Sequence, residues 1–389
     1  MNNKYLFRNC SFRLIFLLLS FWPNMIIAQS TFRASVKTAD KNGRITDYRA
    51  TFTILSEEEA TCALGDGIKC CLSAPSTHLY QVEVPPTVRN FPDPKEYTVV
   101  SIADNAFQPY TISDLSPEPF AYTNDWLKKL ILPNTVKYIG SSEEGVTIEH
   151  LVLPNNLETI GDKAFLYNRL DTIIIPSSVR EIGYRAFSGR CHCVIFEPNT
   201  NLRLSEGAFM WCTIETLTFK EPCNITLSAH AFEAAENEYL NLPIELEEIP
   251  PYCFFNMRNL KMLIIHEKVK KIGHEAFGLS DQCQPIIISD ASEPCECDED
   301  AFTDAFTLPR HDYFDGTLIV PDGSKEKYLN ATGWNKITTI IEQHEAVGIT
   351  NMMSGSKSKS MEAFNLSGRR VSALQKGIFI LNGKKIFVK

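Results

Sequence analysis

The residue types best suited to metal binding or catalysis occur in two short cysteine clusters. The chain reads Cys191-His192-Cys193 and, about a hundred residues later, Cys295-Glu296-Cys297. Thiolate and imidazole groups are zinc ligands, and a cysteine beside a histidine is also the nucleophile and base of a thiol hydrolase. Zinc sites, however, usually pair C-x-x-C motifs at matching distances, and neither cluster has that spacing. The pattern therefore favours disulfides or buried thiols, and we predict no metal ligand and no cofactor.

An acidic stretch offers a second kind of chemistry. The segment SDASEPCECDEDAFTD, which begins at Ser289, collects Asp290, Glu293, Glu296, Asp298, Glu299, Asp300 and Asp304. Clustered carboxylates can bind calcium, but their spacing does not match the calcium loop of an EF-hand. The sequence favours a solvated turn.

Catalytic signatures are missing from the sequence. The chain contains neither G-x-S-x-G nor H-E-x-x-H, and no glycine-rich phosphate loop follows a strand. Its eight histidines are scattered along the chain. We therefore predict no catalytic residue and no enzyme, and the alternative from this class is an extracellular hydrolase that uses Cys191 or His192.

The charge balance excludes several partner classes. The 389 residues carry a formal net charge of −9, with 44% hydrophobic and 22% charged residues. An acidic chain without a basic run is a poor ligand for nucleic acid or for an anionic membrane surface. After residue 28 no stretch is apolar enough to cross a bilayer, so we predict no membrane span in the mature chain.

The first 28 residues predict a secretory signal. Basic residues precede the apolar run Leu14–Phe21, and Ala28 offers a small residue at the cleavage point before Gln29. The rival interpretation is a membrane anchor, but the apolar run is short and Pro23 interrupts it. Cleavage would place the mature chain outside the cytoplasm, either secreted or on the bacterial cell surface, where its eleven remaining cysteines could form disulfides.

A repeat organises most of the chain. An Ala-Phe or Cys-Phe step recurs, and from Phe165 onward the phenylalanines are 22, 22, 23, 22, 23 and 25 residues apart. A fixed period in this range predicts stacked rungs of a solenoid. The phenylalanines of this step are Phe107, Phe165, Phe187, Phe209, Phe232, Phe254, Phe277 and Phe302.

Each rung has the same internal order. A short apolar β-rich run ends in a polar or proline-containing turn, and an Ile-Gly step then precedes the Ala-Phe step. One such run fits in each rung, so successive strands should lie parallel in one sheet. The glycine suits a positive φ or a close backbone approach, and the phenylalanine should be buried against its counterparts. These intervals are too short for the crossover helices of a doubly wound α/β enzyme.

The rung resembles the BspA-like subclass of leucine-rich repeats over residues 80–345. The residues that carry this resemblance are Leu170, Ile173, Ile175, Pro176, Val179, Ile182, Gly183, Ala186 and Phe187. The resemblance implies an α/β-type repeat solenoid with repeats of 22–23 residues, and a surface protein that binds protein or glycoprotein partners.

The segments outside the full repeats are expected to close or extend the solenoid. Residues 29–105 predict an N-terminal β cap and first-rung entry, 106–316 the repeats, 317–345 a C-terminal capping unit, 346–361 a linker and 362–389 a β tail. The capping unit resembles the terminal unit of the same family through Leu318, Val320, Pro321, Gly323, Ser324, Tyr328, Gly333, Trp334 and Glu342. In the cap and the last rung, the favoured disulfides pair Cys62 with Cys70 or Cys71, and Cys283 with Cys295 or Cys297.

The tail also resembles the end of a type IX secretion sorting domain. The match rests on Leu366, Gly368, Gly377, Ile378, Ile380, Gly383, Lys384 and Lys389. Such domains are longer than this tail. The alternative is a plain C-terminal hairpin around Asn382-Gly383.

The outer face of the solenoid sheet is the predicted binding face. Strand alternation should turn Ile173 and Ile175 inward and leave one rather apolar row exposed. The alternatives are that flanking segments cover this row or that β-branched residues simply favour strands. The residues predicted to line this face are His150, Val152, Thr172, Ile174, Ile195, Thr216, Thr218, Tyr239, Asn241, Met262, Ile264 and Ile287.

The sequence thus predicts a non-enzymatic surface protein whose partner is an extracellular protein or glycoprotein, as in adhesion. The first alternative is a structural or assembly component of the bacterial outer surface. The hydrolase is the second.

Overall fold

The computed structural model describes residues 30–68, 70–72, 80–107, 127–143, 147–278, 284–303 and 313–346, together with the backbone of four strands between residues 363 and 388. The predicted signal segment, most of the linker and Cys283 lie outside the described residues. The chain divides into two units, Met1–Glu215 and Thr216–Lys389.

The first unit begins with a cap of six strands. They are β1 (Thr31–Ala39), β2 (Ile45–Ser56), β3 (Thr61–Leu64), β4 (Gln81–Glu83), β5 (Thr87–Arg89) and β6 (Glu96–Ile102). Strands β1, β2 and β3 are antiparallel neighbours, and residues along β1 alternate between exposed and buried. Phe52 and Tyr97 form its core with Phe32. Because β4 pairs with β7 and β6 pairs with β8, the cap hydrogen-bonds to both strands of the first rung and joins them in one sheet.

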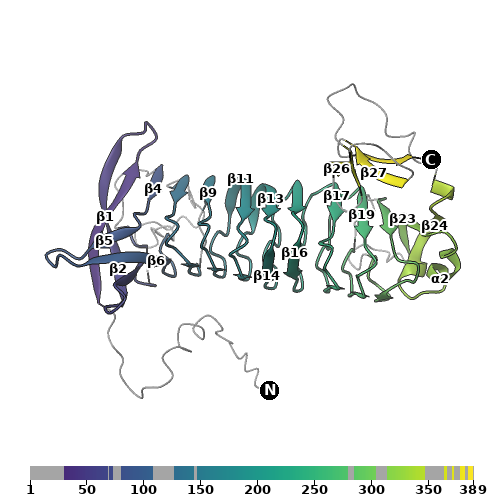
Figure 1. Ribbon diagram of the computed structural model, residues 1–389, viewed down its shortest axis with the longest axis horizontal. Helices are drawn as coiled ribbons and strands as arrows, with labels where there is room; N and C mark the ends of the chain where they lie inside the picture. The colour runs from purple at the N-terminus through teal and green to yellow at the C-terminus, as the bar shows by residue number, and fades with distance from the viewer. Residues whose placement is uncertain are drawn as a thin grey trace, which may run out of the picture. The chain divides into compact units, whose positions relative to one another are not determined.

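The rungs of the first unit each contain a first and a second strand (Figure 1). The first strands are β7 (Lys129–Ile131), β9 (His150–Val152), β11 (Asn168–Ile175) and β13 (Gly189–Phe196). The second strands are β8 (Tyr138–Ile139), β10 (Thr159–Ile160), β12 (Glu181–Ile182) and β14 (Thr200–Leu204). The pairings of β7 with β9, of β11 with β13 and along the second strands are parallel. The predicted parallel solenoid is confirmed, but the prediction of one strand per rung is wrong, because a second strand follows the turn of each of these rungs.

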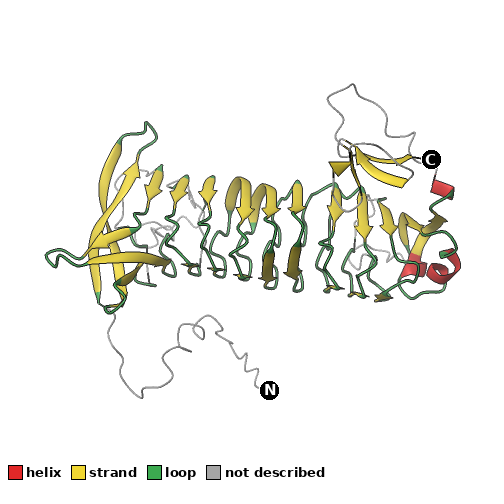
Figure 2. Cartoon of the chain, viewed as in Figure 1, coloured by secondary structure: helices red, strands yellow, loops and turns green. Residues whose placement is uncertain are grey.

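The second unit repeats this plan. Its solenoid strands are β15 (Thr216–Phe219), β16 (Cys223–Thr226), β17 (Tyr239–Asn241), β18 (Glu248–Ile249), β19 (Met262–Ile265), β20 (Lys271–Ile272), β21 (Ile286–Ser289), β22 (Glu296–Cys297), β23 (Phe314–Val320) and β24 (Ile337–Glu342). Strands β17, β19, β21, β23 and β24 form one parallel sheet, and β18, β20 and β22 form another. Among the described residues, helix occurs only near the end of this unit, in α2 (Lys325–Leu329), the 3-10 turn Trp334–Lys336 and the 3-10 residues 345–346 (Figure 2).

The tail forms a separate antiparallel sheet. Its strands are β25 (Ala363–Asn365), β26 (Arg370–Val371), β27 (Gly377–Leu381) and β28 (Lys384–Val388), in the order β26-β25-β27-β28. Strands β27 and β28 pair as the Asn382-Gly383 turn predicted.

Stacked phenylalanine rings form the spine of each unit. In the first unit, the ring of Phe187 lies 5.3 Å from that of Phe165 and 5.1 Å from that of Phe209. In the second, Phe254 stacks between Phe232 and Phe277 at 5.6 and 5.5 Å. Each of these rings is at most 1% exposed, so the stacking predicted from the repeat is confirmed. A rung on its own could not bury its ring, which is why the repeat must be stacked.

The Ile-Gly step is required by a close approach of neighbouring rungs. A Cβ atom placed on Gly183 would lie 2.5 Å from Asp162 Oδ1 and 2.6 Å from the Asp162 nitrogen. Asp162 Oδ1 already accepts a hydrogen bond from the Tyr184 N–H at 2.7 Å. A positive φ angle instead recurs on the residue two before the repeat phenylalanine, as at Arg185 with φ 50°, in every rung except that of Phe302.

Replacing Gly183 with alanine should therefore lower the free energy of unfolding by about 1–3 kcal/mol, because the added methyl group forces two packed turns apart. Ser205 occupies the same step one rung later and already has a Cβ atom, so Ser205→Ala is the matched control. Urea denaturation of both variants measures the difference. Equal stability of the two variants would contradict a steric role for Gly183.

Candidate binding face

The outer face of the first unit exposes apolar side chains. Along β9, Leu151 is buried while Val152 is 78% exposed, and along β11 Ile174 is 45% exposed between the buried Ile173 and Ile175. In register with these residues, Ile131 lies beside Val152 and Ile195 lies beside Ile174. Parallel strands thus hold apolar groups toward solvent on a sheet whose other side is core.

Polar groups border this apolar row. His150 and Thr172 are exposed on the same strands, two residues before Val152 and Ile174. Thr172 lies beside the half-buried Cys193. Lys128 and Glu149, which precede β7 and β9, form an ion pair. An apolar patch with a polar rim is typical of an interaction surface.

The second unit contributes mostly polar groups at its first strands. Thr216, Tyr239 and Asn241 are exposed, and Thr218 is half-buried. Their neighbours on β19 are Met262, beside Tyr239, and Ile264, beside Asn241.

Three of the predicted face residues need correction. Met262 and Ile264 lie on the outer face but are each only 5% exposed, so they do not line an open surface. The outward direction predicted for Ile287 is also wrong. This residue points into the core, is 1% exposed and pairs with Leu263. The longer rung before Phe302 adds a residue ahead of β21, and a one-residue slip reverses the face of a strand. Ile288 takes the outer position beside Ile264.

Sequence reasoning also missed Ile131, Ile286 and Ile319, which lie on the same outer rows. Ile131 had a visible signal, since Leu130-Ile131-Leu132-Pro133 repeats the pattern of Leu151-Val152-Leu153-Pro154.

The described cysteines have free thiols. They are Cys62, Cys70, Cys71, Cys191, Cys193, Cys212, Cys223, Cys253, Cys295 and Cys297. The predicted disulfide between Cys62 and Cys70 or Cys71 is therefore wrong in this structure. Cys295 and Cys297 are free as well, and Cys283, their predicted partner, lies outside the described residues. Within the described part of the chain, no cysteine belongs to a group of three possible metal ligands.

Cys191 and His192 do not form a catalytic pair. Cys191 is fully buried, and burial raises the pKa of its thiol to about 12. A protonated thiol in the core is a poor nucleophile. His192 Nδ1 instead lies 2.6 Å from Glu215 Oε1. The arrangement offers no activated thiolate to a substrate.

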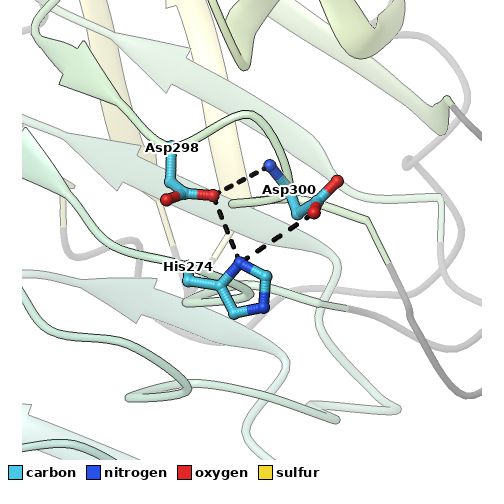
Figure 3. Close-up of side chains that lie close together, drawn as sticks. All are labelled: His274, Asp298 and Asp300. Carbon is cyan, nitrogen blue, oxygen red and sulfur yellow. Dashed lines mark hydrogen bonds and ion pairs between the residues drawn. The ribbon is translucent and has the colours of Figure 1, made fainter.

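His274, Asp298 and Asp300 form a polar cluster on consecutive rungs (Figure 3). His274 Nδ1 lies 3.2 Å from Asp298 Oδ1 and 4.0 Å from Asp300 Oδ2. Asp298 Oδ1 also accepts a hydrogen bond from the Asp300 N–H at 3.1 Å. These contacts join two turns, and we assign the cluster no metal.

Two other acidic residues of this region, Glu293 and Glu299, form ion pairs with lysines of the C-terminal cap. Lys327 pairs with Glu293, and Lys336 Nζ lies 3.3 Å from Glu299 Oε1. The acidic turn thus forms ion pairs with the cap as well as facing solvent.

The C-terminal cap contains a second polar cluster, whose charges depend on pH. His344 Nδ1 lies 2.9 Å from Asp322 Oδ1, and this contact raises the pKa of His344 and lowers the pKa of Asp322. Glu342 and Glu345 also face the imidazole. The stabilisation from His344 is complete below its unfolded pKa of about 6.5 and is lost as pH rises through its folded pKa. That from Asp322 is lost as pH falls through a folded pKa below about 3.9.

Asp322→Asn should therefore move the pKa of His344 back toward its ordinary value. Titration of the imidazole signals by nuclear magnetic resonance measures this shift. The cap of the unchanged protein should be most protected from hydrogen exchange between about pH 4 and pH 6.5. An unchanged His344 pKa in the variant would show that Asp322 is not the group that raises this pKa.

The repeats match a known family. A family model described as the BspA type leucine rich repeat region matches residues 114–225 and 194–308, with six copies that together span about half of the chain. This chain belongs to the BspA-type leucine-rich repeat family. The family predicted from the sequence and its repeat fold are thus confirmed.

Three solved structures are similar to this BspA-type chain. The pneumococcal vaccine antigen PcpA is 16% identical, with 79% of this chain and 98% of that chain covered and a TM-score of 0.35. A leucine-rich repeat protein from Bacteroides ovatus ATCC 8483 is 22% identical, with 77% and 76% covered and a TM-score of 0.45. A leucine-rich cell surface protein from Faecalibacterium prausnitzii A2-165 is 14% identical, with 79% and 94% covered and a TM-score of 0.30. No curated protein matches this BspA-type chain.

The described residues of this BspA-type chain contain no helix with the length and apolar character needed to cross a membrane.

Proposed function

We propose that this protein is a non-catalytic surface protein that binds an extracellular protein or glycoprotein through the outer face of its first unit. The observation that carries the proposal is the exposed apolar row of Val152 and Ile174, held on a sheet whose inner side is packed. An exposed row of this kind leaves apolar area in water, and a partner that covered it would remove that area from solvent.

The stacked core supports binding by a preformed surface. Ile173 and Ile175 anchor β11 from inside, and both are at most 1% exposed. A partner would therefore meet side chains whose backbone is already ordered, and binding would require little change of shape. Membership of a surface repeat family supports an extracellular or surface location.

Binding of the mature chain, beginning at Gln29, to an array of extracellular-matrix proteins and glycans tests the proposal. The double variant Val152→Glu/Ile174→Glu places two charges on the apolar row without touching the core. Ile45→Glu is the matched control, because Ile45 is also exposed, at 71%, but lies in the N-terminal cap.

Saturable binding that the double variant loses and the control keeps is the expected result. Binding that survives in the double variant would move the site away from this face. Binding to bacterial envelope components alone would favour the structural or assembly role.

A further inference from the structure

The outer face of the second unit is closed where the same face of the first unit is open. Ile264, Ile288 and Ile319 occupy neighbouring strands β19, β21 and β23 and stand in register with one another. Their exposed fractions are 5%, 0% and 6%. Val152 and Ile174 have the same place on their own rungs and are exposed at 78% and 45%.

Neighbours within a sheet do not explain this burial. The solenoid core lies on the other side of these strands, where Leu263, Ile287 and Leu318 pack inward. Adjacent side chains of one sheet screen each other laterally but leave their ends in water, as Val152 shows. A second layer must therefore cover the three isoleucines, because stacked sheets are what remove such ends from solvent.

The chain itself enters this face at the end of the solenoid. Ala346 is buried in one apolar cluster with Met262, Ile288 and Ile319, and Ile286 and Ile341 pack at its border. Ala346 lies four residues after β24, the last solenoid strand, and directly precedes the segment that leads to the tail. The segment that follows the last rung thus starts on the covered face.

The tail has the size and composition of a covering layer. It forms a four-stranded antiparallel sheet, and β27 and β28 read GIFIL and KKIFV. So small and apolar a sheet needs to bury apolar area against another element to be stable. The 16 residues of segment 347–362 have a root-mean-square reach of about 20–25 Å if flexible, which exceeds the width of about 15 Å of four strands.

Charge favours the same contact. Residues 363–389 contain six basic and no acidic side chains, whereas residues 29–346 contain 27 basic and 46 acidic ones. A basic sheet tethered to an acidic solenoid is attracted to it at any orientation, and the apolar cluster then defines where the sheet binds.

We propose that the sheet β25–β28 docks on the outer face of β19, β21 and β23, against Ile264, Ile288 and Ile319. The docked tail closes this part of the sheet to other partners. It leaves the first unit and Tyr239 as the open part of the face. This inference does not depend on the proposed partner, because it concerns only contacts within the chain.

Cleavage of the linker in the full mature chain tests the docking. A protease site inserted between residues 351 and 360 allows the tail to be cut from an otherwise intact protein. After cutting, the tail is expected to co-elute with the solenoid on size-exclusion chromatography. Ile288→Glu should release it, whereas Ile174→Glu, the matched change on the open face, should not.

Separation of the tail from the unsubstituted chain, or its retention by a folded Ile288→Glu variant, would overturn the proposal. A second measurement needs no substitution. Carbene labelling of Ile288 should rise to the level of Ile174 once the cut tail has been displaced with denaturant and the solenoid refolded without it. Unchanged protection of Ile288 would mean that something other than the tail covers it, for example a second copy of the chain.

Discussion

Replacing Phe187 with alanine is expected to lower the free energy of unfolding of the first unit by about 3–5 kcal/mol. The ring is fully buried and stacked between Phe165 and Phe209. Rungs above and below both rest on it, so neither can move into the cavity without losing its own contacts. The loss should therefore fall at the upper end of the range for a buried ring.

The matched control is Ile174→Ala, on the outer face of the same rung as Phe187. Because Ile174 is 45% exposed, the substitution should change the unfolding free energy by less than about 1 kcal/mol. Urea denaturation combined with hydrogen exchange of the central rungs measures both, since repeat proteins need not unfold in a single step. Similar losses from the two substitutions would contradict the assignment of inner and outer faces.

Replacing Trp334 with alanine should have the largest effect in the second unit, again about 3–5 kcal/mol. Trp334 is fully buried and closes the phenylalanine stack, with its ring 5.4 Å from Phe302 and 5.1 Å from Tyr328. Its Nε1–H donates a hydrogen bond to the Cys295 carbonyl at 3.0 Å. The substitution removes the ring contacts and this hydrogen bond. It also opens the end of the core to solvent, so aggregation should accompany the loss of stability.

Trp211→Ala is the control for this prediction. Trp211 is 57% exposed, and the guanidinium carbon of Arg185 lies 4.4 Å from its ring centre. An exposed cation–π contact contributes about 0.5–1 kcal/mol, so this variant should stay soluble and almost fully stable. Denaturation midpoints and light scattering of the two tryptophan variants provide the comparison. A stable and soluble Trp334→Ala protein would show that the end of the core needs no cap.

The repeat made most of the fold predictable, because one physical constraint recurs in every rung. The phenylalanine stack, the parallel strands and the inward direction of Ile173 and Ile175 all follow from a fixed spacing. The short second strand of each rung did not, since two residues such as Glu181-Ile182 are too few to show a strand pattern. The sequence also left open whether Gly183 is needed for a positive φ or for a close backbone approach. The structure shows the close approach.

The face was predictable only where the spacing was regular. Val152 and Ile174 lie in rungs of ordinary length, and their outward direction followed from counting. Ile287 lies 24 residues after its inward counterpart Leu263, whereas Leu263 lies 23 after Leu240, and this one extra residue reverses the strand. The burial of Met262 and Ile264 could not be read from their own strands at all, because it depends on a layer supplied by a segment distant in the sequence.

The central claim is that the outer face is open in the first unit and closed in the second. Carbene footprinting of a chain of residues 29–389, resolved to single residues by mass spectrometry, tests it most directly. We expect strong labelling of Val152 and Ile174 and almost none of Ile264 and Ile288. Equal labelling of the two pairs would contradict both the binding face and the docked tail.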